Sequence, residues 1–246
     1  MIMEERGDVM MIDPDVCIAC ESCVPYCPVG AISVKEEHAE INQVQCVECG
    51  VCLRAAVCSV DAIIEPALQW PRTLRALFSN PITVFEETGV AGRGTDEIKS
   101  NDVTGRYRRG EAGFGIEMGR PGTGTTFRQV QQMTMALAKI GGQFEKENPL
   151  TTLLSNLDTG TIREDILDER VLTAIVEFKV PIRRIGEVLD ALKEIEKEVD
   201  TVFSVDYISR PEADGSLPAV EEAKRIGYEL SSHVKICAGL GRPKID

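Results

Sequence analysis

The chain of 246 residues carries 27 Lys and Arg residues against 40 Asp and Glu residues, which gives a formal net charge of −13 at pH 7. This negative charge argues against binding to nucleic acid or to an anionic membrane surface. Hydrophobic residues make up 43% of the chain, too many for a disordered protein, and the length suits one large domain or two smaller ones.

The sequence also predicts a cellular location. No segment is both long and apolar enough to span a bilayer. Residues 1–13 contain acidic side chains and no long apolar run, unlike a signal peptide. We therefore expect a cytoplasmic protein, in which thiols stay reduced and clustered cysteines more often hold metal than form disulfides.

Eight of the nine cysteines lie in the first 58 residues, in two similar runs. The first, Cys17–Cys27, reads C-x2-C-x2-C-x3-C and is followed by proline. The second, Cys46–Cys58, reads C-x2-C-x2-C-x5-C and is followed by serine. The residues after the runs also match, since 28–32 read Pro-Val-Gly-Ala-Ile and 59–63 read Ser-Val-Asp-Ala-Ile. This pattern indicates an internal duplication with eight metal-type ligands.

The spacing suits an iron–sulfur cubane, which needs four thiolates, one for each iron. Three cysteines spaced by two residues can bind three corners, and the fourth thiolate comes from further away. Residues 10–66 thus resemble a bacterial-type ferredoxin domain with two [4Fe-4S] clusters. In that family the fourth cysteine of each run ligates the other cluster. The resemblance implies one cluster on Cys17, Cys20, Cys23 and Cys58, and a second on Cys46, Cys49, Cys52 and Cys27.

The second run departs from the family pattern without losing a ligand. Two extra residues lie between Cys52 and Cys58, and Ser59 stands where proline is usual. Structural zinc is the alternative cofactor, but zinc ribbons use paired C-x2-C knuckles rather than triplets. We expect apolar residues near the runs to shield the clusters from water; these are Val16, Ile18, Val24, Val29, Ile32, Val44, Val47, Val51, Val60 and Ile63.

Acidic residues are concentrated in the same segment. Residues 1–66 contain 12 Asp and Glu and 3 Lys and Arg, a net charge of −9, whereas the other 180 residues have a net charge of −4. A negative surface would steer a redox partner protein with a basic docking surface. The alternative is that these charges only keep the protein soluble.

Beyond residue 66 the patterns predict a second domain. A helix is expected over 71–78 and a strand over 82–85. Residues 112–118 alternate like a strand, and 127–140 show helical spacing. A strand over 172–178, an amphipathic helix over 182–199 and a strand over 203–207 follow, with one further strand between 143 and 170 and a short helix over 218–226.

This order of elements predicts an α+β protein whose C-terminal part is an α/β sandwich of split βαβ type. Residues 111–209 resemble the ferredoxin-like βαββαβ fold of ACT-type regulatory domains, which implies a small-molecule effector and an oligomer formed through this part. We expect a ferredoxin domain over 1–66, a linker and Gly/Arg-rich loop region over 67–110, and a βαββαβ-like domain with a C-terminal extension over 111–246.

Two further features have open roles. Segment 89–124 holds ten of the 21 glycines and several arginines, typical of either a loop that binds an anion or partner or a flexible connection. Cys237 is not needed by either cluster, and an inert buried thiol is favoured over a redox role. The turn between strand and helix is a candidate anion or effector loop or an ordinary tight turn; its residues are Gly119, Arg120, Gly122, Thr123 and Gly124.

Three functions are compatible with these features. The first is an electron carrier that passes single electrons through two [4Fe-4S] clusters to or from a partner oxidoreductase, with an anaerobic host as the natural setting. The second is the electron-transfer subunit of a multi-subunit reductase. The third is a redox or effector sensor that uses the ACT-like domain. Because no flavin, nicotinamide or substrate motif is recognisable, a non-catalytic redox protein is favoured over an enzyme.

Overall fold

The computed structural model describes residues 8–85, 90–91, 105–120 and 122–229. The chain divides into two units that alternate along the sequence. The first unit comprises Met1–Gly92, Gly119–Phe127 and Glu164–Thr173. The second comprises Arg93–Met118, Arg128–Arg163 and Ala174–Asp246. Helices and sheets are both present, so the protein is of the mixed α+β class; the domain limits expected from the sequence remain a prediction.

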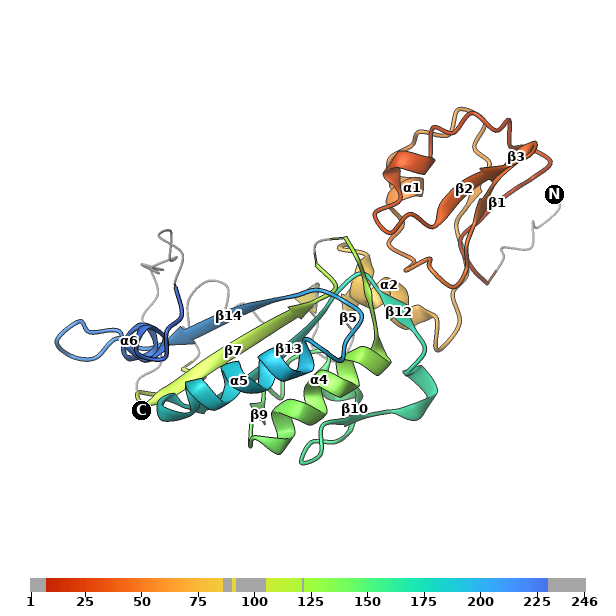
Figure 1. Ribbon diagram of the computed structural model, residues 1–246. Coiled ribbons are helices and arrows are strands. Elements are labelled where there is room, and N and C mark those ends of the chain that lie inside the picture. The colour runs from red at the N-terminus through yellow and green to blue at the C-terminus, as the bar shows by residue number, and fades with distance from the viewer. Residues whose placement is uncertain (1–7, 86–89, 92–104, 121, 230–246) are drawn as a thin grey trace. The chain divides into compact units, whose positions relative to one another are not determined.

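The N-terminal part of the first unit consists of two pairs of short antiparallel strands (Figure 1). The first pair joins the two ends of this segment, and the second is a hairpin whose turn contains Glu36 with φ 52°. Two short helices lie between the strands. The elements are β1 (Met11–Ile12), η1 (Val24–Tyr26), β2 (Ile32–Lys35), β3 (His38–Ile41), α1 (Val51–Arg54) and β4 (Ile63–Ile64). Of the two helices, η1 is flanked by Cys23 and Cys27, and α1 contains Cys52.

The rest of the first unit comes from three separated segments. Phe78 and Phe127 are fully buried and meet edge to face with ring centroids 5.3 Å apart, which fastens the segments together. The helix expected over 71–78 is present over Thr73–Ser79, and the strand expected over 82–85 covers only Val84–Phe85. The elements are α2 (Thr73–Ser79), β5 (Val84–Phe85), β6 (Val90–Ala91), β8 (Thr125–Thr126), η3 (Glu164–Ile166) and β12 (Arg170–Val171).

The second unit is built on a four-stranded antiparallel sheet in the order β14-β7-β13-β9. One face of β7 is apolar, and Phe114 stacks on Phe178 of β13 with ring centroids 5.2 Å apart. The opposite face carries Gly113, where a Cβ atom would lie 2.2 Å from the ring of Tyr107, so only glycine fits there. The strands are β7 (Glu111–Met118), β9 (Gln143–Phe144), β13 (Ala174–Pro181) and β14 (Phe203–Ser209).

Two amphipathic helices pack on this sheet, and Figure 1 shows α4 and α5 on the same side of it. Their buried residues recur every three or four positions, as expected for helices with one apolar face. Both helices are confirmed, but α5 ends at Ile195, before the expected Val199. The helical elements are α4 (Phe127–Lys139), η2 (Thr151–Leu153), η4 (Ile182–Arg184), α5 (Ile185–Ile195) and α6 (Pro218–Arg225), and β10 (Leu154–Asn156) pairs with β11 (Thr161–Ile162).

Candidate metal centres

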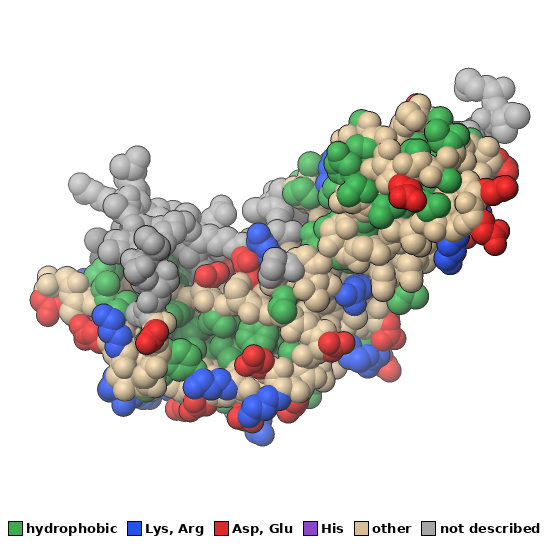
Figure 2. Space-filling view, turned by 45° about the horizontal axis from the view of Figure 1, so that its top comes forward, with side chains coloured by type: hydrophobic (Ala, Val, Ile, Leu, Met, Phe, Trp, Pro, Cys, Tyr) green, Lys and Arg blue, Asp and Glu red, His purple; other side chains and the backbone are tan. Residues whose placement is uncertain are grey.

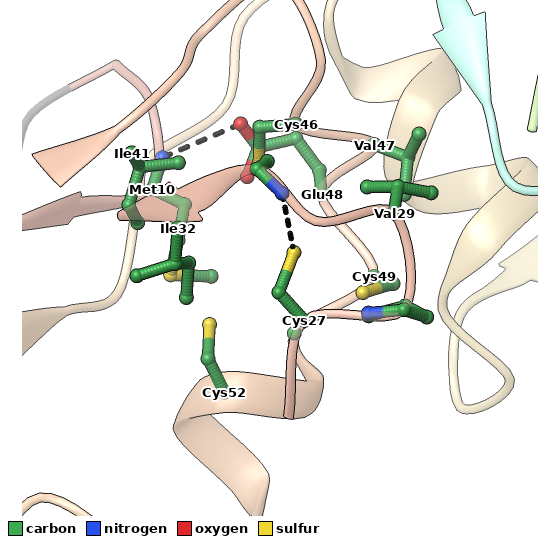
Figure 3. Close-up of a pocket in the computed structure, with 13 residues that line it drawn as sticks. Met10, Cys27, Val29, Ile32, Ile41, Cys46, Val47, Glu48, Cys49 and Cys52 are labelled. Atoms are coloured by element: carbon green, nitrogen blue, oxygen red, sulfur yellow. Dashed lines mark hydrogen bonds between the residues drawn. The ribbon is translucent and has the colours of Figure 1, made fainter. Parts of the chain in front are cut away.

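Two sulfur-lined cavities lie in the N-terminal part of the first unit, and each draws its cysteines from both runs. We call them the first site and the second site. The first site is lined by Cys17, Cys20, Cys23 and Cys58. The second site is lined by Cys27, Cys46, Cys49 and Cys52, and Figure 3 shows these side chains around one space. The folding of the chain thus brings together the two sets of four cysteines that the family resemblance implied.

The backbone around the two sites repeats as the sequence does. Ala19 and Glu48 occupy equivalent positions between ligands, and both have φ 53°. Glu21 and Gly50, each following a ligand, have φ 61° and φ 65°. This left-handed conformation is unfavourable for residues other than glycine and persists where the surroundings enforce it. The ligand loops are therefore wound tightly in both halves.

Backbone N–H groups donate hydrogen bonds to the sulfur atoms in the same repeated way. Ala31 N lies 3.1 Å from Cys27 Sγ, and Ala62 N lies 3.2 Å from Cys58 Sγ. In each half the donor is four residues after the acceptor. Ala39 N donates to Cys17 Sγ over 3.4 Å. Such bonds stabilise negative charge on sulfur, so these sites suit thiolates that carry an iron cluster.

The two sites differ in exposure to solvent. Cys46, Cys49 and Cys52 of the second site are all buried. At the first site Cys20 is exposed, and the other ligands are half-buried. An electron acceptor could therefore approach the sulfur of the first site more closely than that of the second.

Burial also changes the acidity of the thiols. It raises the pKa of Cys46 to about 12, where the neighbouring Glu48 carboxylate adds to the effect, and it raises the pKa of Cys52 to about 11. In contrast, a hydrogen bond with the Ser22 side chain lowers the pKa of Cys20. The thiols of Cys46 and Cys52 therefore need bound metal cations to become thiolates near neutral pH.

The longer second run forms the four-residue helix α1 where the first run forms the three-residue helix η1. The residues inserted between Cys52 and Cys58 complete α1, and Ala56 then reverses the chain with φ 49°. Arg54 at the end of α1 donates a hydrogen bond of 2.8 Å to Asn80 Oδ1. The insertion thus changes the surface beside the second run and leaves the ligand Cys58 in the first site.

The expected apolar shield is only partly present. Ile32, Val47 and Ile63 are buried, as expected. The expectation is wrong for three others, which are largely exposed: Val16 at 42%, Ile18 at 60% and Val44 at 78%. Of these three, Ile18 lines the cavity of the first site, so that site has an apolar side chain facing solvent.

Sequence reasoning missed a group of charged side chains beside the second site. Glu48 is buried and forms an ion pair with Arg72, with 2.6 Å between Oε1 and Nη2. Arg75 is buried and donates to the backbone carbonyl of Cys46 over 2.7 Å. The available signal was the acidic residue between two ligands of the second run, where the first run has Ala19.

The candidate anion loop belongs to the first unit. Its Thr123 and Gly124 N–H groups both donate to the Gly119 carbonyl, over 3.2 and 3.0 Å. Arg170 Nη2 donates to the Thr123 carbonyl over 2.7 Å. These bonds support the tight-turn alternative, because two amides of the loop already have acceptors inside it. Arg120 and Gly122 are exposed; Cys237 and much of segment 89–124 lie outside the described residues.

Comparison with known proteins locates family similarity at the N-terminus. A family model described as "4Fe-4S binding domain" matches residues 10–33. Ferredoxin-1 of Rhodobacter capsulatus is 39% identical over 64 residues, which cover 24% of this chain and 95% of that protein. The family model covers the first cysteine run, Cys17–Cys27.

Two other relatives are longer than the stretch that they share with this chain. A subunit of the ion-translocating oxidoreductase complex of Methanosarcina acetivorans is 45% identical over 60 residues, 24% of this chain and 22% of that protein. Pyruvate synthase subunit PorD of Methanothermobacter marburgensis is 44% identical over 52 residues, 21% of this chain and 58% of that protein. The chain thus matches less than two thirds of the length of either relative. Among the described residues, no helix has both the length and the apolar character needed to cross a membrane.

Proposed function

This chain belongs to the ferredoxin family through its N-terminal bacterial-type ferredoxin domain, and from that premise we propose that it passes single electrons through two [4Fe-4S] clusters to or from a partner oxidoreductase. The observation that carries the proposal is the pair of cavities, each lined by four cysteines drawn from both runs.

The donor set fits the proposed cofactor. Four thiolates per site match the four irons of a cubane. The N–H groups of Ala31 and Ala62 stabilise charge at the cysteine that each site takes from the other run. A [4Fe-4S] cluster bound at such a site takes up one electron from a reduced donor protein and releases it to an oxidised acceptor. The chain's own residues hold the thiolates, limit water access and present one edge to the partner.

Iron and acid-labile sulfide analysis tests this proposal. Protein purified without oxygen is expected to contain about eight irons and about eight sulfides per chain, because two cubanes hold four of each. Dithionite reduction should then produce EPR signals of reduced [4Fe-4S] clusters. About four irons or fewer, together with bound zinc, would refute the two-cluster proposal.

We propose the exposed edge of the first site as the place of electron exchange. Cys20 is exposed there, beside Ile18 and the acidic Glu21. Figure 2 shows acidic side chains on the visible face of the ferredoxin part. An apolar centre with an acidic margin suits a partner with a basic docking surface, and opposite charges speed the encounter.

Reversing one charge at this edge should slow electron transfer to a basic acceptor. For Glu21→Lys we expect the second-order rate of reduction of a basic c-type cytochrome to fall several-fold at low ionic strength and to approach the unaltered rate at high salt, measured by stopped flow. Glu198→Lys makes the same charge change at an exposed position of the second unit. An equal effect in both variants would show that net charge alone matters.

Two relatives favour the alternative that the chain is a subunit of a larger reductase, since they are named as subunits of an ion-translocating oxidoreductase complex and of pyruvate synthase. Anaerobic co-purification from the native host separates the two proposals. A stable complex with an oxidoreductase supports the subunit, whereas a chain that elutes alone supports the mobile carrier.

For the second unit we propose the ferredoxin-like βαββαβ arrangement. The order of strands in its sheet supports this. In chain order the strands are β7, β9, β13 and β14, and in the sheet β7 lies between β14 and β13, with β9 at the edge next to β13. The resemblance to ACT-type domains adds a sensor as a further alternative. Isothermal calorimetry with amino acids and small carboxylates tests it, and the absence of binding heat would exclude it.

A further inference from the structure

The two cluster sites come from a duplicated sequence, yet among the residues that the structure describes a charged group with two buried members borders only the second. The group consists of Glu48, Arg72, Arg75 and Glu169, all in the first unit. Arg75 is 7% exposed and Glu48 is 2% exposed. Because a buried charge is strongly disfavoured unless it is paired, this group carries a cost that the first half of the repeat avoids.

Arg75 holds the ligand loop of the second site through its backbone. Its Nη1 donates to the carbonyls of Gln43 and Cys46, over 2.9 and 2.7 Å. Its Nε lies 2.5 Å from Glu169 Oε2. A guanidinium is always charged and its rigid fork suits such multiple bonding. One positive charge is thus fixed directly against the segment that carries the ligand Cys46.

Arg72 and Glu48 form the second half of the group. Arg72 donates from Nε to Glu48 Oε1 over 2.7 Å and from Nη2 to Gln43 Oε1 over 2.6 Å. Glu48 lies between the ligands Cys46 and Cys49, and its side chain is drawn beside the cavity in Figure 3. Its other oxygen, Oε2, is buried without a hydrogen-bond partner among the described residues.

The equivalent position of the first run shows that the backbone does not require this charge. Ala19 has the same φ of 53° and carries no charge. A carboxylate at a strained, buried position beside a cofactor site points to a role in the chemistry of that site. A charge this close to a cluster in a low-dielectric interior changes the energy of adding an electron.

We propose that this buried group makes the two sites electrically unequal: Arg75 acts as a positioning residue that favours the reduced state of the cluster at the second site, and Glu48 opposes it. This inference rests on the proposed two-cluster function. Reduction adds one negative charge to the cluster, so a fixed positive charge raises its potential and a fixed negative charge lowers it. These residues would then set the midpoint potential of the second site, while the first site would exchange electrons with the partner.

Opposite shifts from two variants test the proposal. In EPR-monitored potentiometric titrations of the full chain, Arg75→Gln should move one of the two midpoint potentials to a more negative value. Glu48→Gln should move that same potential to a more positive value. If the two residues had only a structural role, both substitutions would shift the potential in the same direction or disturb the EPR signals of both clusters. The signal that survives in Cys58→Ser protein identifies the second site.

The controls keep the test decisive. Arg184→Gln removes an equal charge from an exposed ion pair of the second unit, with 2.7 Å between Arg184 and Glu187, and should move neither potential. Arg75→Lys keeps the positive charge, so its midpoint potential should lie close to that of the unaltered protein. If the Arg75→Gln protein does not retain the second cluster, Glu48→Gln decides alone: a positive shift confined to the second site supports the proposal, and no shift or a negative shift overturns it.

Iron analysis separates failure of this inference from failure of the function. About eight irons with unmoved potentials would overturn only the role of the charged group. About four irons or fewer in the unaltered protein would overturn the two-cluster function itself.

Discussion

The Cys58→Ser protein is expected to lose the cluster of the first site and to contain about half the iron of the unaltered protein. Cys58 is the last cysteine of the second run, but it lines the cavity of Cys17, Cys20 and Cys23. Its sulfur also accepts a hydrogen bond from Ala62 N over 3.2 Å, which orients it there. Iron and sulfide analysis with EPR of anaerobically purified protein measures the effect.

Cys27→Ser is the matched control, because the duplication gives Cys27 the mirrored position. Its sulfur accepts from Ala31 N over 3.1 Å and lines the second site. We expect this variant to lose about half the iron as well, but from the other cluster. The two variants should therefore retain different EPR signals. Retention of the same signal by both would contradict the crossed ligand sets.

Gly119→Ala should strongly destabilise the fold at the turn after β7. Gly119 has φ 87°, and a Cβ atom there would lie 2.7 Å from the Leu172 carbonyl and 2.9 Å from the carbonyl carbon of Gly124. Both obstacles are backbone atoms, which cannot rotate away as a side chain would. We expect the free energy of unfolding to fall by about 3 kcal/mol. Urea unfolding monitored by circular dichroism under anaerobic conditions measures this loss.

Gly110→Ala separates conformational strain from steric overlap. Gly110 precedes the same strand and has φ 82°, but nothing lies within 4 Å of an added Cβ atom. The left-handed conformation alone costs about 1 kcal/mol for alanine. Gly119→Ala should therefore cost clearly more than Gly110→Ala. Equal losses would mean that the turn at Gly119 relaxes around the added methyl group.

Local patterns predicted most of the elements because they depend on short-range periodicity. The buried positions of α5 recur at helical spacing, and β7 alternates, so the sequence predicts both elements. The helix was expected to reach Val199 but ends at Ile195, and turn geometry at a helix end is less strongly encoded than its apolar face. Exposure was predicted less well, as Val16, Ile18 and Val44 show.

The repeated cysteine spacing is enough to indicate thiolate ligands for iron clusters without any knowledge of the fold. The difference between the two sites, in contrast, depends on contacts between residues that are distant in the sequence. Arg75 and Glu169 are 94 positions apart, and Arg72 and Glu48 are 24 apart, so no short-range period links them. Such pairs form when distant segments pack and exclude water. The low dielectric constant there strengthens the electrostatic interactions of their charges. The duplicated sequence thus predicts two like sites, and long-range packing makes them unlike.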